Sequence, residues 1–219
     1  MSRTYNCDEP ESRATGIREA ADAVRLGQLV VLPTDTVYGL GADAFDPEAV
    51  GALLAAKARG RDMPVPVLVS SETMLAGIVA DLPEAASRLA DEFWPGGLTI
   101  IVRHQPSLAW DLGESLGTVA VRMPAHPVAL ELITETGPLA VSSANISGSP
   151  PATTVDEAHD QLGGSVSVYL DGGECAESVP STIVDLTGDA PVVRREGAID
   201  AEELRKALPD LDAGAESDA

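Results

Sequence analysis

Short apolar segments alternate with helical segments along most of this chain, and this order limits the possible folds more than any other feature of the sequence. Segments with apolar residues at helical spacing lie at 16–26, 46–59, 83–93 and 127–135. Apolar runs typical of buried strands lie at 28–33, 65–70, 98–103, 118–122, 139–142 and 166–170. Two more strand-like runs, 181–186 and 192–195, follow closely and predict a closing hairpin. We therefore expect a single α/β domain with a partly antiparallel sheet.

The two ends of the chain lack the periodicity of the middle. Residues 1–14 and the last residues, PDLDAGAESDA, are polar and acidic. Segments of this kind bury too little apolar surface to fold by themselves. We expect residues 1–14 to be flexible, 15–200 to form the domain, and 201–219 to be a short helix with an acidic, flexible tail.

Acidic residues outnumber basic ones by 35 to 14, which gives a formal net charge of −21, and only Lys57 and Lys206 are lysines. A chain of this charge has no broad basic surface for nucleic acid. It is either an ordinary acidic protein or one from a very salty cytoplasm, and the scarcity of lysine favours the second, halophilic interpretation. The polar N-terminus is no signal peptide, and no apolar run approaches the about 20 residues that span a membrane. We therefore expect a cytoplasmic protein without membrane contact.

Polar, glycine-rich segments follow several of the apolar runs. PTDTVYGLG (33–41) stands where α/β proteins place ligands, and it could hold a small polar ligand or form a turn. VSSANISG (141–148) leaves backbone N–H groups free for an anion, although such loops are also common turns. STIVD (181–185) with RREG (194–197) adds two arginines that could contact an anion or form surface ion pairs.

A further polar segment, KARGR at 57–61, places three cations within five residues. Lys57 and Arg59 would point about 200° apart in a continuing helix, but they can share a face if the helix unwinds near Gly60. Converging cations would grip a triphosphate by charge and by bidentate hydrogen bonds. The alternative is that they complement the negative end of the helix dipole, which is the weaker interpretation in so acidic a chain.

Seven blocks in a fixed order are far more specific than any one of these segments. They are PTDTVYGLG, KxR, WPGGLT, TVAVRMPAHP, SSANISG, STIVDL and RREGAI, which lie between residues 33 and 199, and the resemblance that they carry covers about residues 16–199. In this order they resemble the YrdC-like family, which comprises L-threonylcarbamoyladenylate synthases and their relatives. The resemblance implies a single domain with a twisted, mixed and largely antiparallel sheet, flanking helices and a concave, basic cavity.

The resemblance also implies a reaction, in which L-threonine, bicarbonate and ATP give threonylcarbamoyl-AMP and pyrophosphate for the modification of tRNA. It assigns threonine binding to Thr36, Arg122 and Ser181. It assigns ATP binding to Lys57, Arg59, Thr118, Ser143, Asn145 and Arg195, of which Lys57 and Arg59 are also the expected catalytic residues. Magnesium is expected to be carried on the ATP, since the sequence holds no obvious carboxylate cluster for it.

The expected partners are a downstream threonylcarbamoyl-transferase complex and, weakly, RNA. This chain departs from the family pattern at Leu68, where many relatives carry a histidine that would contact threonine. The alternative function is that of an RNA-binding YrdC-like paralogue without this activity. The net charge of −21 and the 3% of aromatic residues oppose that alternative.

Overall fold

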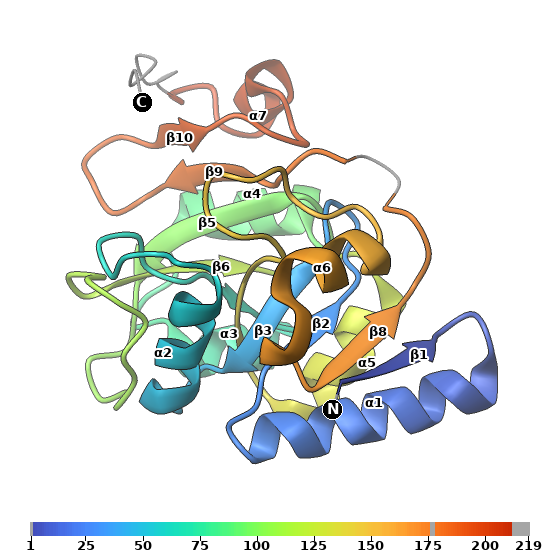
Figure 1. Ribbon diagram of the computed structural model, residues 1–219. Coiled ribbons are helices and arrows are strands. Elements are labelled where there is room, and N and C mark those ends of the chain that lie inside the picture. The colour runs from blue at the N-terminus through green and yellow to red at the C-terminus, as the bar shows by residue number, and fades with distance from the viewer. Residues whose placement is uncertain (1, 176–177, 212–219) are drawn as a thin grey trace.

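The computed structural model describes residues 2–175 and 178–211, which form one mixed sheet covered by helices on both faces (Figure 1). Its ten strands lie in the order β1-β8-β2-β3-β7-β4-β6-β5-β9-β10. The strands are β1 (Arg3–Asn6), β2 (Val30–Leu32), β3 (Gly39–Asp43), β4 (Val67–Leu68), β5 (Leu98–Arg103), β6 (Thr118–Arg122), β7 (Leu139–Ser143), β8 (Val168–Asp171), β9 (Thr182–Asp185) and β10 (Val192–Arg195). Of the nine pairings between these described strands, five are antiparallel and four are parallel, so the expected mixed α/β sheet is confirmed.

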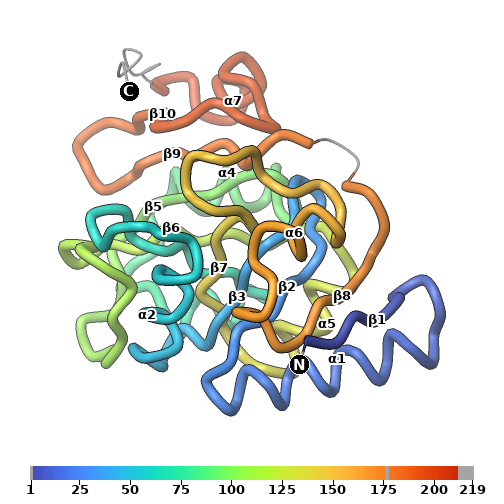
Figure 2. The backbone as a smooth tube through the Cα atoms, viewed as in Figure 1, coloured from blue at the N-terminus to red at the C-terminus, as the bar shows by residue number. Residues whose placement is uncertain are grey.

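The helices pack on the two faces of this sheet. They are α1 (Pro10–Arg25), α2 (Pro47–Ala56), α3 (Glu72–Ile78), α4 (Glu84–Phe93), α5 (Pro127–Thr136), α6 (Val155–Leu162) and α7 (Ala201–Ala207), with a 3₁₀ turn, η1 (Gly163–Ser165). One buried cluster joins α1 and α5 to the sheet, and a second joins α2, α4, α6 and α7 to its other face. The backbone trace shows the β9–β10 hairpin and α7 at the end of the sheet opposite to β1 and α1 (Figure 2).

Alternate residues of the central strands enter opposite clusters, which explains why their sequences are apolar without a break. Val30 and Leu32 of β2 belong to the cluster of α1 and α5, whereas Val31 between them belongs to the other cluster. Side chains of a strand point alternately to the two faces of its sheet. A strand that is covered on both faces therefore needs apolar residues at every position.

The predicted helix and strand limits agree well with the structure where the local sequence is decisive. Helix α2 begins where Asp46 and Pro47 predict it, because the Asp46 carboxylate accepts hydrogen bonds from two backbone N–H groups of the first turn. Strands β5 and β6 have the predicted bounds, 98–103 and 118–122. The predicted hairpin at 181–186 and 192–195 is the antiparallel pair β9–β10.

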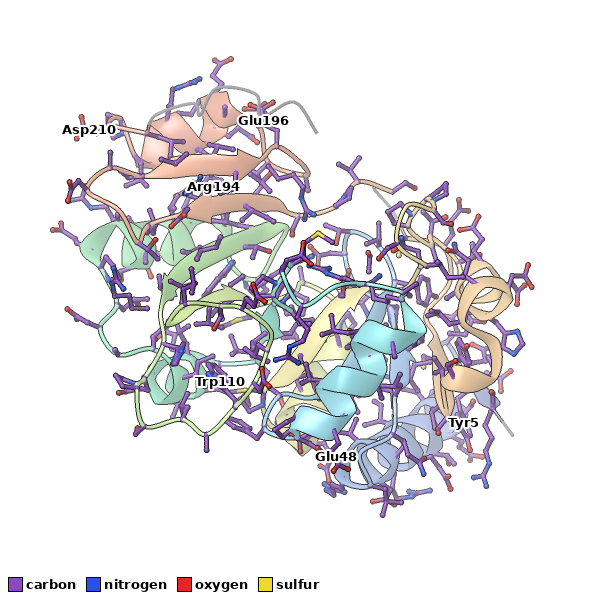
Figure 3. The ribbon with its side chains drawn as sticks, turned by 60° about the vertical axis from the view of Figure 1, so that its left-hand side comes forward. Tyr5, Glu48, Trp110, Arg194, Glu196 and Asp210 are labelled. Carbon is purple, nitrogen blue, oxygen red and sulfur yellow. The ribbon has the colours of Figure 1, made fainter. Side chains whose placement is uncertain are left out.

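The expectation of a flexible segment at residues 1–14 is wrong. Strand β1 pairs in parallel with β8, and α1 begins at Pro10 rather than near Gly16. The physical reason is a long-range contact, because Gly16 lets α1 lie directly against β1. A Cβ atom at Gly16 would lie 2.6 Å from Cβ of Tyr5. Figure 3 shows Tyr5 at the end of the molecule opposite to Arg194 and Glu196.

Other segments also differ from the sequence-based expectations. The segment 33–41 does not remain a loop throughout, because Gly39–Asp43 forms β3 between β2 and β7. Helices α3 and α6 were not predicted, whereas the short helix expected after residue 200 is α7. The acidic tail from residue 212 onward lies outside the described residues. No helix of the described ranges is long and apolar enough to cross a membrane.

Candidate active site

A cavity of about 340 Å³ lies among strand ends and loops from both halves of the chain. This volume is within the range of about 300–1,000 Å³ that small-molecule sites occupy. Most of the predicted site residues line it, namely Thr36, Arg59, Thr118, Arg122, Ser143, Ser181 and Arg195. Lys57 and Asn145 are not among the lining residues. Both are neighbours of Ser143, which does line the cavity. Lys57 donates to the carbonyl of Ser143, and Asn145 follows Ser143 by two positions.

Arg122, at the end of β6, is held in place from three directions. Its Nε donates to the carbonyl of Gly96 at 2.9 Å, its Nη1 to Oγ1 of Thr36 at 2.8 Å, and its Nη2 to Oδ1 of Asp35 at 2.8 Å. Burial lowers the pKa of Arg122, and the Asp35 carboxylate opposes that shift. A guanidinium has five N–H groups, so two of those on Arg122 have no acceptor among the described residues and can bind an anion in the cavity.

Arg195 of β10 is anchored by Ser181, the residue before β9. Its guanidinium donates to the backbone carbonyl and the hydroxyl of Ser181, and Ser181 Oγ also lies 2.8 Å from Oγ1 of Thr99. Burial lowers the pKa of Arg195, and repulsion from Arg122 and Arg59 lowers it further. All three arginines line the same cavity, although they come from distant parts of the chain.

The chain reverses direction directly after α2, and this reversal decides where the KARGR cations point. Helix α2 ends at Ala56, and Ala58 has a φ of 50°, which is the left-handed conformation. The helix does not continue to Gly60, so Lys57 and Arg59 are not separated by the 200° of a regular helix. Lys57 reaches Asn145 just after β7, and Arg59 reaches Ser142 near the end of β7, as the hypothesis of converging cations requires.

Lys57 is 2% exposed, and its ammonium is surrounded by oxygen atoms of the protein. Its Nζ donates to the backbone carbonyl of Ser143 and to that of Asn145, the latter at 2.7 Å. Asn145 Oδ1 lies at 3.4 Å from the same nitrogen. Burial, helped by repulsion from Arg59, lowers the pKa of Lys57 to about 8. The ammonium therefore supports the wall of the cavity from behind.

Arg59 lies in the wall itself and is oriented by its own loop. Its Nε donates to the carbonyl of Met63 at 3.1 Å and its Nη2 to that of Pro64 at 3.3 Å, while Nη1 donates to Oγ of Ser142 at 3.0 Å. Burial lowers the pKa of Arg59. Within the described part of the chain, the acceptors of this guanidinium are neutral oxygens, so its charge remains available to a ligand.

Three of the four cations of this site lack the acidic partners that the composition would suggest. In the part of the chain that the structure describes, Arg122 pairs with Asp35, but no carboxylate lies within 4.0 Å of the charged nitrogens of Lys57, Arg59 or Arg195. Burying a charge is costly unless it is paired. Two arginines at the cavity without a carboxylate partner among the described residues, and the buried Lys57 beside Ser143, therefore point to an anionic ligand in a chain with 35 acidic residues.

The polar groups that line the cavity are hydroxyls and guanidinium groups rather than carboxylates. Within residues 2–175 and 178–211, no three His, Cys, Asp or Glu side chains gather where they could hold a metal ion. Mg²⁺ in nucleotide sites is commonly bound by substrate phosphates with few protein ligands. The donor set of this cavity therefore fits a magnesium ion that arrives on a phosphate group.

Three further residues belong to the site, although the sequence did not indicate them as site residues. Thr34 and Thr99 line the cavity, and Asp35 holds Arg122. All three belong to the PTDTVYGLG and WPGGLT blocks, so their proximity to assigned residues was the available signal. Leu68, the departure from the family pattern, also lines the cavity and adds an aliphatic surface where a histidine would add a polar one.

Comparisons with known proteins identify the relatives of this chain. Residues 22–197 match the model of the Sua5/YciO/YrdC family, whose description is "Telomere recombination". A Mycobacterium tuberculosis protein named "Putative threonylcarbamoyl-AMP synthase" is 55% identical, over 95% of this chain and 96% of its own. The threonylcarbamoyl-AMP synthase of Pyrococcus abyssi is 41% identical, over 89% of this chain and 58% of its own.

Solved structures agree with these sequence matches. The crystal structure of Pyrococcus abyssi Sua5 complexed with L-threonine has a TM-score of 0.89 and 38% identity, and the match covers 97% of this chain and 62% of that one. The crystal structure of Escherichia coli YciO has a TM-score of 0.83 and 28% identity, over 93% of this chain and all of that one. Fold, family model and close relatives agree: this chain belongs to the Sua5/YciO/YrdC family.

Proposed function

We propose that this protein is an L-threonylcarbamoyladenylate synthase, an adenylate-forming enzyme that converts L-threonine, bicarbonate and ATP into threonylcarbamoyl-AMP and pyrophosphate. The observation that carries the proposal is the cavity at which Arg59, Arg122 and Arg195 converge, two of them without a carboxylate partner in the described ranges. Such a site suits a ligand with several negative charges. Relatives with up to 55% identity that carry the synthase name support the same assignment.

We assign the two substrates, L-threonine and ATP, to different parts of the cavity. Arg122 and Thr36 are joined by a hydrogen bond. The guanidinium can pair with a carboxylate and the hydroxyl can bond to a polar group, and this combination suits an amino acid. Ser181 lies beside Arg195, which donates to its carbonyl. Arg59, Thr118 and Ser143 complete the lining toward the KARGR turn, where we place the triphosphate. The proposed threonine and ATP subsites therefore meet between Arg122 and Arg195.

This reaction needs orientation and charge stabilisation more than a dedicated general base. An amine and bicarbonate form a carbamate without a catalyst, so the enzyme acts when a carbamate oxygen attacks the α-phosphorus of ATP. The new bond joins carbamate oxygen to phosphorus, and the bond from that phosphorus to the pyrophosphate oxygen breaks. Both reactants are anions, so fixed cations such as Arg59 and Arg195 lower the barrier by stabilising the transition-state charge. Magnesium bound to ATP would neutralise part of the triphosphate charge.

Lys57 has a supporting place in this mechanism. Its ammonium holds the carbonyls of Ser143 and Asn145 away from the cavity, so the loop after β7 offers the phosphates its hydroxyls and a positive potential from behind. The Asn145 amide has the same supporting character, because its Nδ2 donates to the carbonyls of Ile146 and Ser149. We propose that both residues act on ATP through this loop.

The alternative, an RNA-binding paralogue without this activity, is less favoured. The net charge of −21 opposes nucleic acid, and Arg122 is buried in the cavity, where a phosphate backbone cannot reach it. Contact with RNA would come after the reaction, since the product threonylcarbamoyl-AMP must be consumed by an enzyme that transfers its acyl group to tRNA. A complex that performs this transfer is the partner that we propose.

Release of pyrophosphate tests the proposal. The purified protein, in high salt with magnesium, should release pyrophosphate from ATP only when L-threonine and bicarbonate are both present. Each of the three substrates is omitted in turn, and the adenylate product is identified by its mass. Equal release without threonine would refute the proposal, because the cavity would then serve an ATPase or another acyl acceptor.

A further inference from the structure

Two buried threonine hydroxyls beside the proposed threonine subsite form a hydrogen-bond chain with a fixed direction. Thr34 is 4% exposed and Thr36 is 1% exposed, and both line the cavity. Their Oγ1 atoms lie 3.1 Å apart, a distance at which either hydroxyl could donate to the other. The neighbours of the two hydroxyls decide which one does.

The hydroxyl of Thr34 is fully occupied by the protein. It donates its single proton to the carbonyl of Val37 at 2.6 Å, and a carbonyl can only accept. The backbone N–H of Thr36 donates to the same Oγ1 at 3.2 Å. A hydroxyl has one proton and two acceptor positions, so the remaining position on Thr34 must accept the proton of the Thr36 hydroxyl.

The direction of the Thr36 hydroxyl follows from the partners of Thr34. Its proton points to Thr34, and one of its two acceptor positions takes the N–H of Arg122 Nη1 at 2.8 Å. One acceptor position is left, and it belongs to a residue that lines the cavity. Thr36 can therefore accept a hydrogen bond from a ligand, but it has no proton to donate to one.

We infer that Thr34 is a positioning residue that makes Thr36 a pure acceptor, and that Thr36 binds a hydrogen-bond donor of the substrate rather than its carboxylate. This inference rests on the proposed function. L-Threonine has two groups that can donate, the amine and the side-chain hydroxyl, while its carboxylate has none. The carboxylate is left to the free N–H groups of Arg122, which cannot accept. The two neighbouring residues thus recognise opposite kinds of group on one amino acid.

The test compares Thr34→Val, which removes the hydroxyl at nearly constant shape, with Thr34→Ser, which keeps it. In the pyrophosphate assay, Thr34→Val should raise the KM for threonine by about five- to tenfold, as expected for one lost hydrogen bond, and leave the KM for ATP unchanged. Thr34→Ser should rescue the KM for threonine. Thr134→Val makes the same substitution on α5, away from the cavity, and serves as the matched control. Should Thr34→Val fail to fold, Thr34→Cys, which has only a weak donor, carries the same expectation.

A double substitution separates positioning from general damage. If Thr34 acts through Thr36, adding Thr34→Val to Thr36→Val should raise the KM for threonine no further. Competition by L-valine, which keeps the amine but lacks the hydroxyl, identifies the donor: weaker valine binding in Thr34→Val indicates the amine, and an effect on threonine alone indicates the hydroxyl. An unchanged KM for threonine in Thr34→Val, an equal rise in the KM for ATP, or full additivity of the two substitutions would overturn the inference. Loss of threonine dependence in the unsubstituted protein would instead remove the proposed function itself.

Discussion

Arg195 and Ser181 are joined by a two-pronged contact, in which Nε and Nη2 of the guanidinium donate to the same backbone carbonyl at 3.0 and 2.7 Å. A fork of this kind fixes the plane of the guanidinium, which a lysine ammonium cannot reproduce. The contact therefore holds a cation assigned to ATP against a residue assigned to threonine.

Arg195→Lys should weaken ATP binding by about tenfold, because the ammonium keeps the charge but loses the oriented donors. Calorimetric titration with ATP measures the change. The neighbouring Arg194 offers a matched control, since its exposed guanidinium pairs with Asp185 and does not line the cavity. Arg194→Lys should leave ATP affinity as it is, and an equal loss in both variants would contradict a specific role for Arg195.

Arg59→Ala should weaken ATP binding by tenfold or more with the fold intact. A hydrogen bond to a charged group contributes about 1.5–3 kcal/mol, which corresponds to at least a tenfold change. Arg61, two residues further on, pairs with Asp111 at the surface and supplies the control variant Arg61→Ala. If ATP binds equally well to Arg59→Ala and to the unsubstituted protein, Arg59 serves only its own loop and the end of α2.

Raising the pH through about 8 should lower ATP affinity and raise the free energy of unfolding of the free protein. Burial lowers the pKa of Lys57 from 10.5 to about 8, so the folded state loses this proton first. Between these values the unfolded state binds more protons, and stability therefore increases with pH in that window. Loss of the same charge behind Ser143 removes attraction for phosphate. Titrations with ATP and thermal melts across this range measure both trends, and Lys57→Met should abolish both.

Asp35→Asn should raise the KM for threonine by about tenfold while the KM for ATP stays within about twofold, as expected when a charge-assisted hydrogen bond is replaced by a neutral one. The carboxylate holds Arg122 and also accepts the N–H of Ala125 at 2.8 Å, so its neutral replacement loosens the guanidinium beside Thr36. Thermal melts establish that the variant is folded. A rise of equal size in both KM values would show that Asp35 supports the whole cavity instead of orienting Arg122.

Stability and activity should increase as KCl rises from about 0.1 M to beyond 1 M, because the screening length falls from about 10 Å to about 3 Å. The 35 acidic residues repel one another most strongly in the compact state. Salt also weakens the attraction between ATP and the cavity, but we expect the gain in stability to be larger. Melts and pyrophosphate assays across a KCl series measure the two effects. A melting temperature that is flat or falls with salt would remove the halophilic interpretation and leave the enzymatic one untouched.

Local signals explain which parts of the fold were predictable from the sequence. Asp46 and Pro47 specify the start of α2 through hydrogen bonds within one turn, so no distant residue was needed to find it. Strand β3 was missed because Gly39 and Gly41 are poor strand formers, yet the structure requires them. A Cβ atom at Gly39 would lie 2.6 Å from Val141 of the neighbouring strand. The sequence does not show which strands become neighbours, so the need for these glycines was hidden.

The site was predicted as a set of residues better than as a geometry. Seven of the nine assigned residues line the cavity, as ordered blocks of the sequence indicated. The orientation of Lys57 could not be predicted, because it depends on the left-handed backbone of Ala58 and on carbonyls 86 and 88 positions away. The hydrogen-bond direction of Thr36 likewise depends on Arg122, which is 86 positions distant.

The cavity is assembled from residues that are distant in the chain, from Thr34 to Arg195, and the strand pairs β1–β8 and β5–β9 also close long loops. Contacts of large sequence separation form slowly, because the entropy of loop closure must be lost before they contribute. The chain should therefore refold more slowly than a helical bundle of similar length, and its capacity to bind ATP should return only in the final phase. During synthesis on the ribosome, a partly made chain without β10 lacks Arg195, so we expect it to bind the nucleotide only after β10 has emerged.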